Sequence, residues 1–295
     1  MKKYDYKIYG LTTFFFVALV ANSLFADESQ KGLLWEIDKP GLTPSCLFGT
    51  IHSEDPRVNN LSPIVRNCFE QADSVSLEVQ MDIPTMLKAA SAMVFTGTQS
   101  LEQLVDNAFY EQIVEALRQY NIPSMVVKKL KPWAVIAILS TPPMKTGEFL
   151  DLLLYKKARQ LQIRTYGLEK VEEQLAVFEE LPLSDQIVLL KETLKRLDDM
   201  PIIFAKLHEL YLKRDLTALM KFSIEYMRDN SDNKHLSETF YKRIVDDRNF
   251  IMAKRMQKRL QEGKAFIAVG ALHLPGEKGV LKLLQTRGYR VSSLY

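Results

Sequence analysis

The sequence predicts an α/β (α+β) fold, with a central mixed sheet built from N- and C-terminal segments and a large helical insertion or cap at about 83–261. Three observations favour this fold class. Short apolar runs typical of strands lie near both ends of the chain, and the middle has the apolar spacing of helices. Strand candidates near both ends also run into the same motif, Gly-x-x-His. Segments that share one sheet share one core, so we expect a single domain at 27–295.

The strand candidates are bounded by turn residues. Leu33–Ile37 and the run Cys46–Phe48 are separated by a Pro/Gly turn, which predicts a hairpin. The remaining candidates are Ser74–Val79, Arg164–Leu168, Ala265–Val269 and Tyr289–Ser293.

Helical spacing fills most of the rest. A serine and a proline at 62–63 open a helix that we expect to end near Gln71, because proline is tolerated in a first helical turn. A second helical region extends from Ile83 to about Leu161 with interruptions at prolines, and a third from about Val171 to Gln261. A last helix is expected at about 276–285.

The composition of the 295 residues is that of a globular protein, with 47% apolar and 25% charged residues. The leader segment carries three lysines and one aspartate, so only about +1 of the formal net charge of +3 remains on the mature chain. This balance gives no support for a nucleic-acid partner. It leaves the oligomeric state unknown.

The first 26 residues have the pattern of an export signal. Lys2, Lys3 and Lys7 precede an apolar run at 11–20, and Ala26 offers a small residue for cleavage. We therefore expect a periplasmic or secreted protein cut after Ala26. An uncleaved membrane anchor is the alternative, because the leucine at position 24 is less typical of a cleavage site than alanine.

The chain has two cysteines, Cys46 and Cys68. Export to an oxidising compartment permits a disulfide between them. The alternative is two buried thiols, and the sequence does not decide between these states because a disulfide depends on the distance between the two Cα atoms.

Two of the four histidines end matching motifs. His52 follows Gly49 by three residues, and His273 follows Gly270 in the same way. We expect a sharp turn at each glycine, where positive φ is permitted. Polar groups beyond the carboxyl ends of strands are where α/β sheets bind ligands, so the two imidazoles can bind one metal ion or act as acid and base. Each can also be an ordinary strand-end histidine bonded to a carbonyl.

Two acids lie at the ends of strand candidates. Glu78 ends a buried strand, directly after Leu77, where an unpaired carboxylate is costly, so it needs a metal, a histidinium or an arginine as partner. The alternative is an exposed acid at a strand end. Glu169 follows the strand at 164–168 and either joins the same cluster or caps the next helix.

Arg248 and Asn249 lie in a helix with an apolar stripe. Asn249 shares the inward stripe with Val245, Met252 and Met256, and Arg248 lies at its border. They either bind a carboxylate or oxyanion, or form a salt bridge that packs the helix.

Familiar catalytic motifs do not occur in the sequence. His-Glu-x-x-His, Gly-x-Ser-x-Gly, the phosphate loop and Gly-x-Gly-x-x-Gly are missing, so zincin, serine hydrolase, NTPase and dinucleotide-binding functions have no local support. His208 and His235 are in helical segments without companions, and we interpret both as surface or packing residues.

Several segments together resemble the TraB/GumN family, whose relatives include the Tiki proteases. The likeness extends from Leu33 to Ser293. It rests on Leu47-Phe48-Gly49-Thr50-Ile51-His52, the strand that ends at Glu78, Lys131-Pro132-Trp133, the run from Tyr166 to Gln174, Arg248-Asn249, and the run from Val269 to Gly276.

This resemblance implies a metal-dependent peptide hydrolase that uses manganese or cobalt. It implies His52, Glu78 and His273 as metal ligands and catalytic core, with Arg248 stabilising negative charge. One departure is Glu148-Phe149-Leu150-Asp151, where relatives tend to have a Gly-Val-Asp-like sequence. Asp151 is retained, but the turn before it differs.

Two hypotheses follow. The first is an exported metal-dependent hydrolase that acts on a peptide or protein. The second is a non-catalytic periplasmic binding protein for a peptide, haem or iron. A role as a polysaccharide-related accessory protein is a weaker third interpretation, because no residue supports sugar chemistry directly.

Overall fold

The structure is a computed structural model that describes residues 30–229 and 232–295. The expected leader and its cleavage site therefore lie outside the described residues. The strands are β1 (Leu34–Asp38), β2 (Ser45–Thr50), β3 (Ser74–Leu77), β4 (Arg164–Gly167), β5 (Ala265–Gly270) and β6 (Arg290–Ser293).

These strands form one six-stranded mixed sheet in the order β4-β3-β5-β2-β1-β6. Strands β4, β3, β5 and β2 are mutually parallel neighbours. Strand β1 pairs antiparallel with β2 as the predicted hairpin, and β6 pairs antiparallel with β1. The sheet thus combines strands from both ends of the chain, and the predicted fold class is confirmed.

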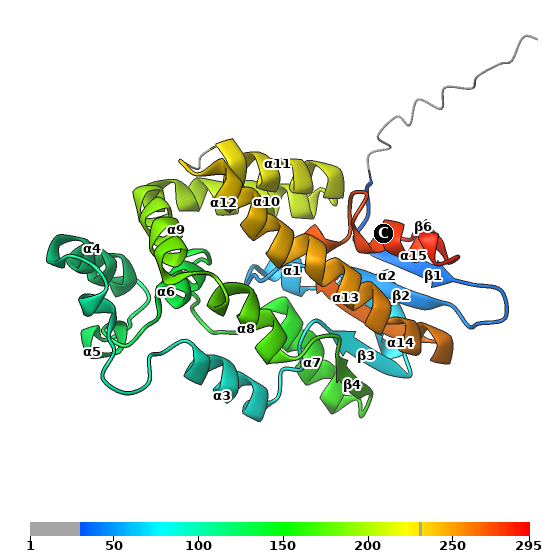
Figure 1. Cartoon of the computed structure of the whole chain (residues 1–295). Helices are drawn as coiled ribbons and strands as arrows, with labels where there is room; N and C mark the ends of the chain where they lie inside the picture. Colours follow the sequence, from blue (N-terminus) through cyan, green and yellow to red (C-terminus); the bar gives the residue numbers. More distant parts are fainter. Residues whose placement is uncertain (1–29, 230–231) are drawn as a thin grey trace, which may run out of the picture.

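Both faces of the sheet are covered by helices. Adjacent residues of one strand, such as Leu47 and Phe48 of β2, are both buried. Successive side chains of a strand point to opposite faces, so burial of both residues means that both faces are covered. On one face the ring of Phe69 packs edge-on against Phe266, with 5.2 Å between the centroids. Helices α13 and α14 cross the near face of the sheet in Figure 1. Burial on both faces explains why the parallel strands are continuous apolar runs.

The helices α1–α7 are Pro56–Asn59, Pro63–Glu70, Ile83–Ala92, Asn107–Arg118, Ser124–Val127, Pro132–Leu139 and Leu150–Gln160. The helices α8–α15 are Val171–Glu179, Leu183–Lys195, Met200–Leu212, Leu216–Asp229, Lys234–Tyr241, Asp247–Arg255, Gln257–Glu262 and Val280–Thr286. Short 3-10 turns are at Leu101–Gln103, Leu197–Asp199 and Ala271–His273, and a π-helical turn is at Lys242–Asp246.

The described residues contain two buried apolar clusters. One surrounds the sheet, and the other lies within the predicted insertion, around residues such as Ile113, Leu139 and Leu190. Helices α4, α5 and α9 of the second cluster lie to the left of the sheet in Figure 1. The assignment of 27–295 to a single domain stays a prediction.

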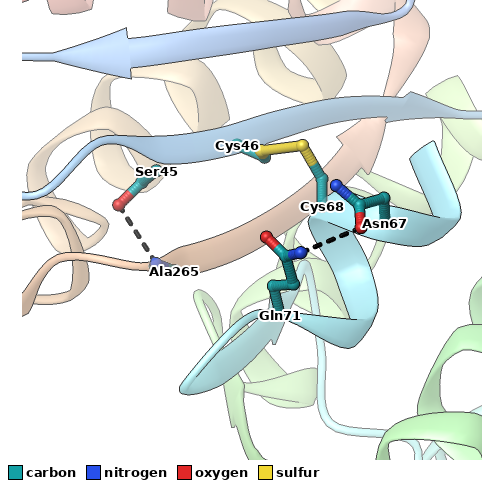
Figure 2. The surroundings of a disulfide bond; sticks show 6 residues. All are labelled: Ser45, Cys46, Asn67, Cys68, Gln71 and Ala265. Carbon is teal, nitrogen blue, oxygen red and sulfur yellow. Dashed lines mark hydrogen bonds between the residues drawn. A yellow bond between two sulfur atoms is a disulfide. The ribbon is translucent and has the colours of Figure 1, made fainter. Parts of the chain in front are cut away.

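Cys46 and Cys68 form a disulfide, so the alternative of two free thiols is wrong. The bond joins β2 to α2, as Figure 2 shows, and the two Cα atoms are 6.4 Å apart. That spacing is within the usual range of disulfides. The bond therefore fixes α2 against the strand that leads to His52.

Replacing both cysteines by serine is expected to lower the free energy of unfolding by about 3 kcal/mol. The bond links residues 22 positions apart, and closing a loop of this size restricts the unfolded chain by roughly that amount. Urea unfolding of the wild type, with and without reductant, and of the double variant measures the effect. The reduced wild type should unfold like the variant; identical midpoints for all three samples would show that the bond contributes nothing.

Candidate active site

The four parallel strands end at the same edge of the sheet, and each is followed by a polar residue. Their order places Glu169 after β4, Glu78 after β3, His273 after β5 and His52 after β2. Strand β5 lies between β2 and β3, although it comes last of the four in sequence. This insertion brings the two Gly-x-x-His motifs to neighbouring strands, with Thr50 paired to Gly270.

Glu78 is a buried carboxylate with several donors. Its Oε1 accepts from the backbone N–H of Gly270 at 2.7 Å, and its Oε2 accepts from Arg248 Nη2 at 2.5 Å and Gln174 Nε2 at 3.0 Å. Burial alone would raise the pKa of Glu78, but the charge of Arg248 and the N–H of Gly270 together hold it well below its usual range. Glu78 is therefore ionised at neutral pH, and arginine is one of the partners that its position required.

Arg248 joins Glu78 to Glu169. Its Nε and Nη2 donate to the Glu169 carboxylate at 2.7–3.2 Å, while Nη1 donates to the carbonyl of Ile244. The side chain of Glu169 is 1% exposed and that of Arg248 14%, so this is a buried cluster. Two carboxylates share one guanidinium, which leaves an excess of negative charge beside His273.

His273 is held in one tautomer by Asn249. The amide nitrogen of Asn249 donates to the carbonyl of Lys278 at 2.9 Å, so its Oδ1 is left as an acceptor for His273 Nδ1 at 2.7 Å. The proton therefore lies on Nδ1, and the lone pair of Nε2 faces Glu78 Oε1 at 3.6 Å. Burial lowers the pKa of His273 to about 4, so the ring is neutral at pH 7.

His52 is paired with Asp151 instead of Glu78. Its Nε2 is 4.0 Å from Asp151 Oδ2, its side chain is 49% exposed, and its ring lies 4.8 Å from that of Phe149. Asp151 Oδ1 accepts from the hydroxyl of Thr50, but the buried Oδ2 has no hydrogen-bond partner among residues 30–229 and 232–295. Burial raises the pKa of Asp151.

The expected reason for the two glycines is wrong. Neither Gly49 nor Gly270 has positive φ; Gly270 has φ −52°. Glycine is needed at both positions because other side chains pack closely against the backbone there. A Cβ on Gly270 would lie 3.1 Å from Glu78 Oε1, and one on Gly49 would lie 2.8 Å from a methyl carbon of Leu274. Glycine at 270 therefore lets the Glu78 carboxylate reach the backbone N–H.

Comparison with known proteins agrees with this arrangement of motifs. Residues 33–293 match the model of the TraB/PrgY/gumN family. The chain belongs to the TraB/PrgY/gumN family. No solved structure matches it.

The curated relatives include animal and bacterial proteins. Metalloprotease TIKI1 of Danio rerio is 24% identical over 311 residues, which cover 88% of this chain and 63% of that protein. Metalloprotease TIKI2 of Danio rerio is 22% identical and covers 90% of this chain and 61% of its own length. The uncharacterized protein YbaP of Escherichia coli (strain K12) is 23% identical, with 85% of this chain and 91% of that protein covered. The match thus spans about three-fifths of the TIKI proteins.

The three metal ligands that resemblance to this family implies do not form one group: His273 lies beside Glu78, and His52 lies beside Asp151. Within residues 30–229 and 232–295, no group of three or more His, Cys, Asp and Glu is close enough to hold a metal ion. Two local features nevertheless fit a cation. The lone pair of His273 Nε2 faces a carboxylate oxygen of Glu78, and two such acceptors repel unless a positive charge lies between them. The buried Asp151 Oδ2 also lacks a hydrogen-bond partner among the described residues.

The structure adds residues that the sequence pattern did not indicate. Gln174, one turn into α8, donates to Glu78 and, at 3.4 Å, to Glu169. Tyr211 donates to the carbonyl of Gly49. His208 was expected to have no companions, but it lines the same cavity as His52. Tyr211 and His208 come from α10, far from the strand ends in sequence, so no local motif indicated them, whereas Gln174 lies in the run from Tyr166 to Gln174 that carries part of the family resemblance.

Proposed function

We propose that this chain is an exported, metal-dependent hydrolase that cleaves peptide bonds. The observation that carries the proposal is the neutral His273, whose Nε2 lone pair faces the ionised Glu78 at the carboxyl end of the parallel strands. Two relatives, TIKI1 and TIKI2 of Danio rerio, are named metalloproteases, which supports the reaction class.

In this proposal His52, Glu78 and His273 hold one divalent ion, manganese or cobalt by resemblance. Such an ion supplies Lewis-acid polarisation of a peptide carbonyl and acidification of water. Glu78 is a ligand or the general base, because it is held ionised. Asp151 faces His52, with 4.0 Å between Asp151 Oδ2 and His52 Nε2.

Arg248 is best described as a positioning residue. Its Nε and Nη2 donors are directed at Glu78 and Glu169, so the contacts favour fixing the carboxylates over binding an oxyanion. The buried Glu169 completes this network from the end of β4.

Export is supported by one feature of the structure besides the expected leader. A disulfide is typical of proteins that fold in an oxidising compartment. In the described part of the chain, every helix is too short or too polar to cross a lipid bilayer.

The proposal is tested by digesting a random peptide library with wild type, His52→Ala and His273→Ala. Cleavage is expected only with manganese or cobalt present and only without chelator, and both His52→Ala and His273→Ala should lose it. His235→Ala is the matched control, because that histidine is exposed and outside the site. Equal cleavage by all four proteins would refute the proposal, and retention of a peptide without turnover would favour a binding protein.

Asn249→Ala is expected to weaken manganese affinity by roughly 10- to 100-fold, as loss of a residue that orients a metal-bound histidine does elsewhere. Asn249→Asp keeps an acceptor for His273 Nδ1 and should recover part of the loss. Titration with manganese, followed by calorimetry, measures both. Equal weakening in the two variants would indicate a packing role for Asn249.

A further inference from the structure

A cavity of about 520 Å³ opens beside His52, outside the cluster around Glu78. Its volume is in the range of ligand sites, roughly 300–1,000 Å³. His52 lines both this cavity and the proposed centre, so a substrate held there would lie next to the reacting bond.

The polar side chains at the base of the cavity are already bonded within the protein. Ser53 Oγ accepts from the N–H of Asp55, and the Asp55 carboxylate binds Arg57. Burial lowers the pKa of His208, so this ring is neutral at pH 7. These side chains therefore offer little to a charged group of a ligand, and Lys145 is the residue that brings a positive charge to the lining.

The carboxylate of Glu54 is also hydrogen-bonded within the protein, and these bonds hold segment 141–149, which forms part of the cavity wall. The carboxylate accepts from the backbone N–H groups of Lys145, Thr146 and Gly147 and from the hydroxyl of Thr146. Three of these bonds reach Oε1 and one reaches Oε2, so most of the acceptor capacity of the carboxylate is used within the protein. Segment 141–149 is thus held against the chain that follows His52.

Further bonds fix the two ends of that segment. Tyr120 donates to the carbonyl of Thr141 at 2.7 Å, and Asn59 donates to the carbonyl of Glu148 at 3.2 Å. Between these ends, Pro142 and Pro143 have fixed φ and no N–H to donate. The wall is therefore formed before any ligand arrives.

What this segment presents to the cavity is mainly apolar. Met144 is 47% exposed although it is a large hydrophobic residue, and the ring of Phe149 packs against that of His52 at an interplanar angle of 37°. Pro56, Pro142 and Pro143 complete the apolar lining. Apolar walls with few free polar groups select apolar ligands.

We propose that this cavity is the subsite for a bulky apolar side chain of the peptide substrate, at a residue that flanks the cleaved bond. The position of this subsite next to a cleaved peptide bond rests on the proposed function. Binding of an apolar side chain in the cavity does not depend on it. Met144 is the specificity residue, because it is exposed, lines the cavity and is not part of the proposed metal centre.

The test is affinity selection from a random peptide library on immobilised full-length protein, with chelator present so that nothing is cleaved. Wild type should enrich Leu, Met or Phe at one position. Met144→Glu should lose this enrichment by about tenfold or more, since a change in one pocket group is worth that much discrimination. Met144→Leu should keep it, and so should Met125→Glu, a control at a methionine that is 77% exposed on α5.

Two results would overturn the subsite: no apolar enrichment with wild type, or the same enrichment with Met144→Glu. Addition of manganese to the wild type then separates the two proposals. Apolar selection without hydrolysis leaves the subsite standing and removes the proposed peptidase activity.

Discussion

Replacing Arg248 by methionine is expected to lower the free energy of unfolding by about 3–5 kcal/mol, the usual result of removing one partner of a buried ion pair. Arg248 is the arginine that both Glu78 and Glu169 contact, and its side chain is 14% exposed. Without it two buried carboxylates face each other uncompensated. Urea unfolding monitored by circular dichroism measures the change.

The chain offers a matched control in the same helix. Arg255 donates to Glu173 through two nitrogens, but these side chains are 40% and 35% exposed, so Arg255→Met should cost below about 1 kcal/mol. Adding Glu78→Gln and Glu169→Gln to Arg248→Met should restore part of the lost stability. Equal effects of the two arginine substitutions would mean that burial of the Arg248 cluster has no energetic consequence.

Glu78→Gln is expected to reduce peptide cleavage by about 10³-fold while the protein remains folded. Glutamine keeps the size of the side chain and an oxygen for the N–H of Gly270, but it removes the negative charge that faces His273. A loss of several kcal/mol of charge stabilisation in the transition state corresponds to this factor. Cleavage of a library-derived peptide, at the same excess of manganese for every protein, provides the rate.

Glu173→Gln serves as the comparison, because it removes a carboxylate from the same region that bonds Arg255 and not the site. Its rate should stay within about twofold of wild type. If Glu78→Gln cleaves as fast as this control, Glu78 is neither ligand nor base.

Much of the fold could be predicted because its signals are local. The strand at 265–269 and the stripe through Asn249, Met252 and Met256 are periodic patterns, and the structure buries them as expected. The last helix begins at Val280, four residues later than expected, because Ala271–His273 forms a 3-10 turn and Gly279 precedes the helix. Helix boundaries depend on such turns, which periodicity does not describe.

The site could be predicted only in part. Strand ends and motifs indicated His52, Glu78 and His273, but the placement of β5 between β2 and β3 is a property of the whole sheet. That order pairs His273 with Glu78 and leaves His52 beside Asp151. The role of Glu54 in holding segment 141–149 could not be predicted from the sequence either, because it depends on backbone N–H groups about ninety residues away.

The central claim is that His273 and Glu78, with His52, hold a divalent ion. Calorimetric titration of purified, chelator-treated protein with manganese tests it most directly, with wild type, His273→Ala, Glu78→Gln and the control His235→Ala. The account predicts one ion bound per chain for wild type and control and no detectable binding for the other two. Absence of manganese and cobalt binding to the wild type, or equal binding by all four proteins, would contradict it.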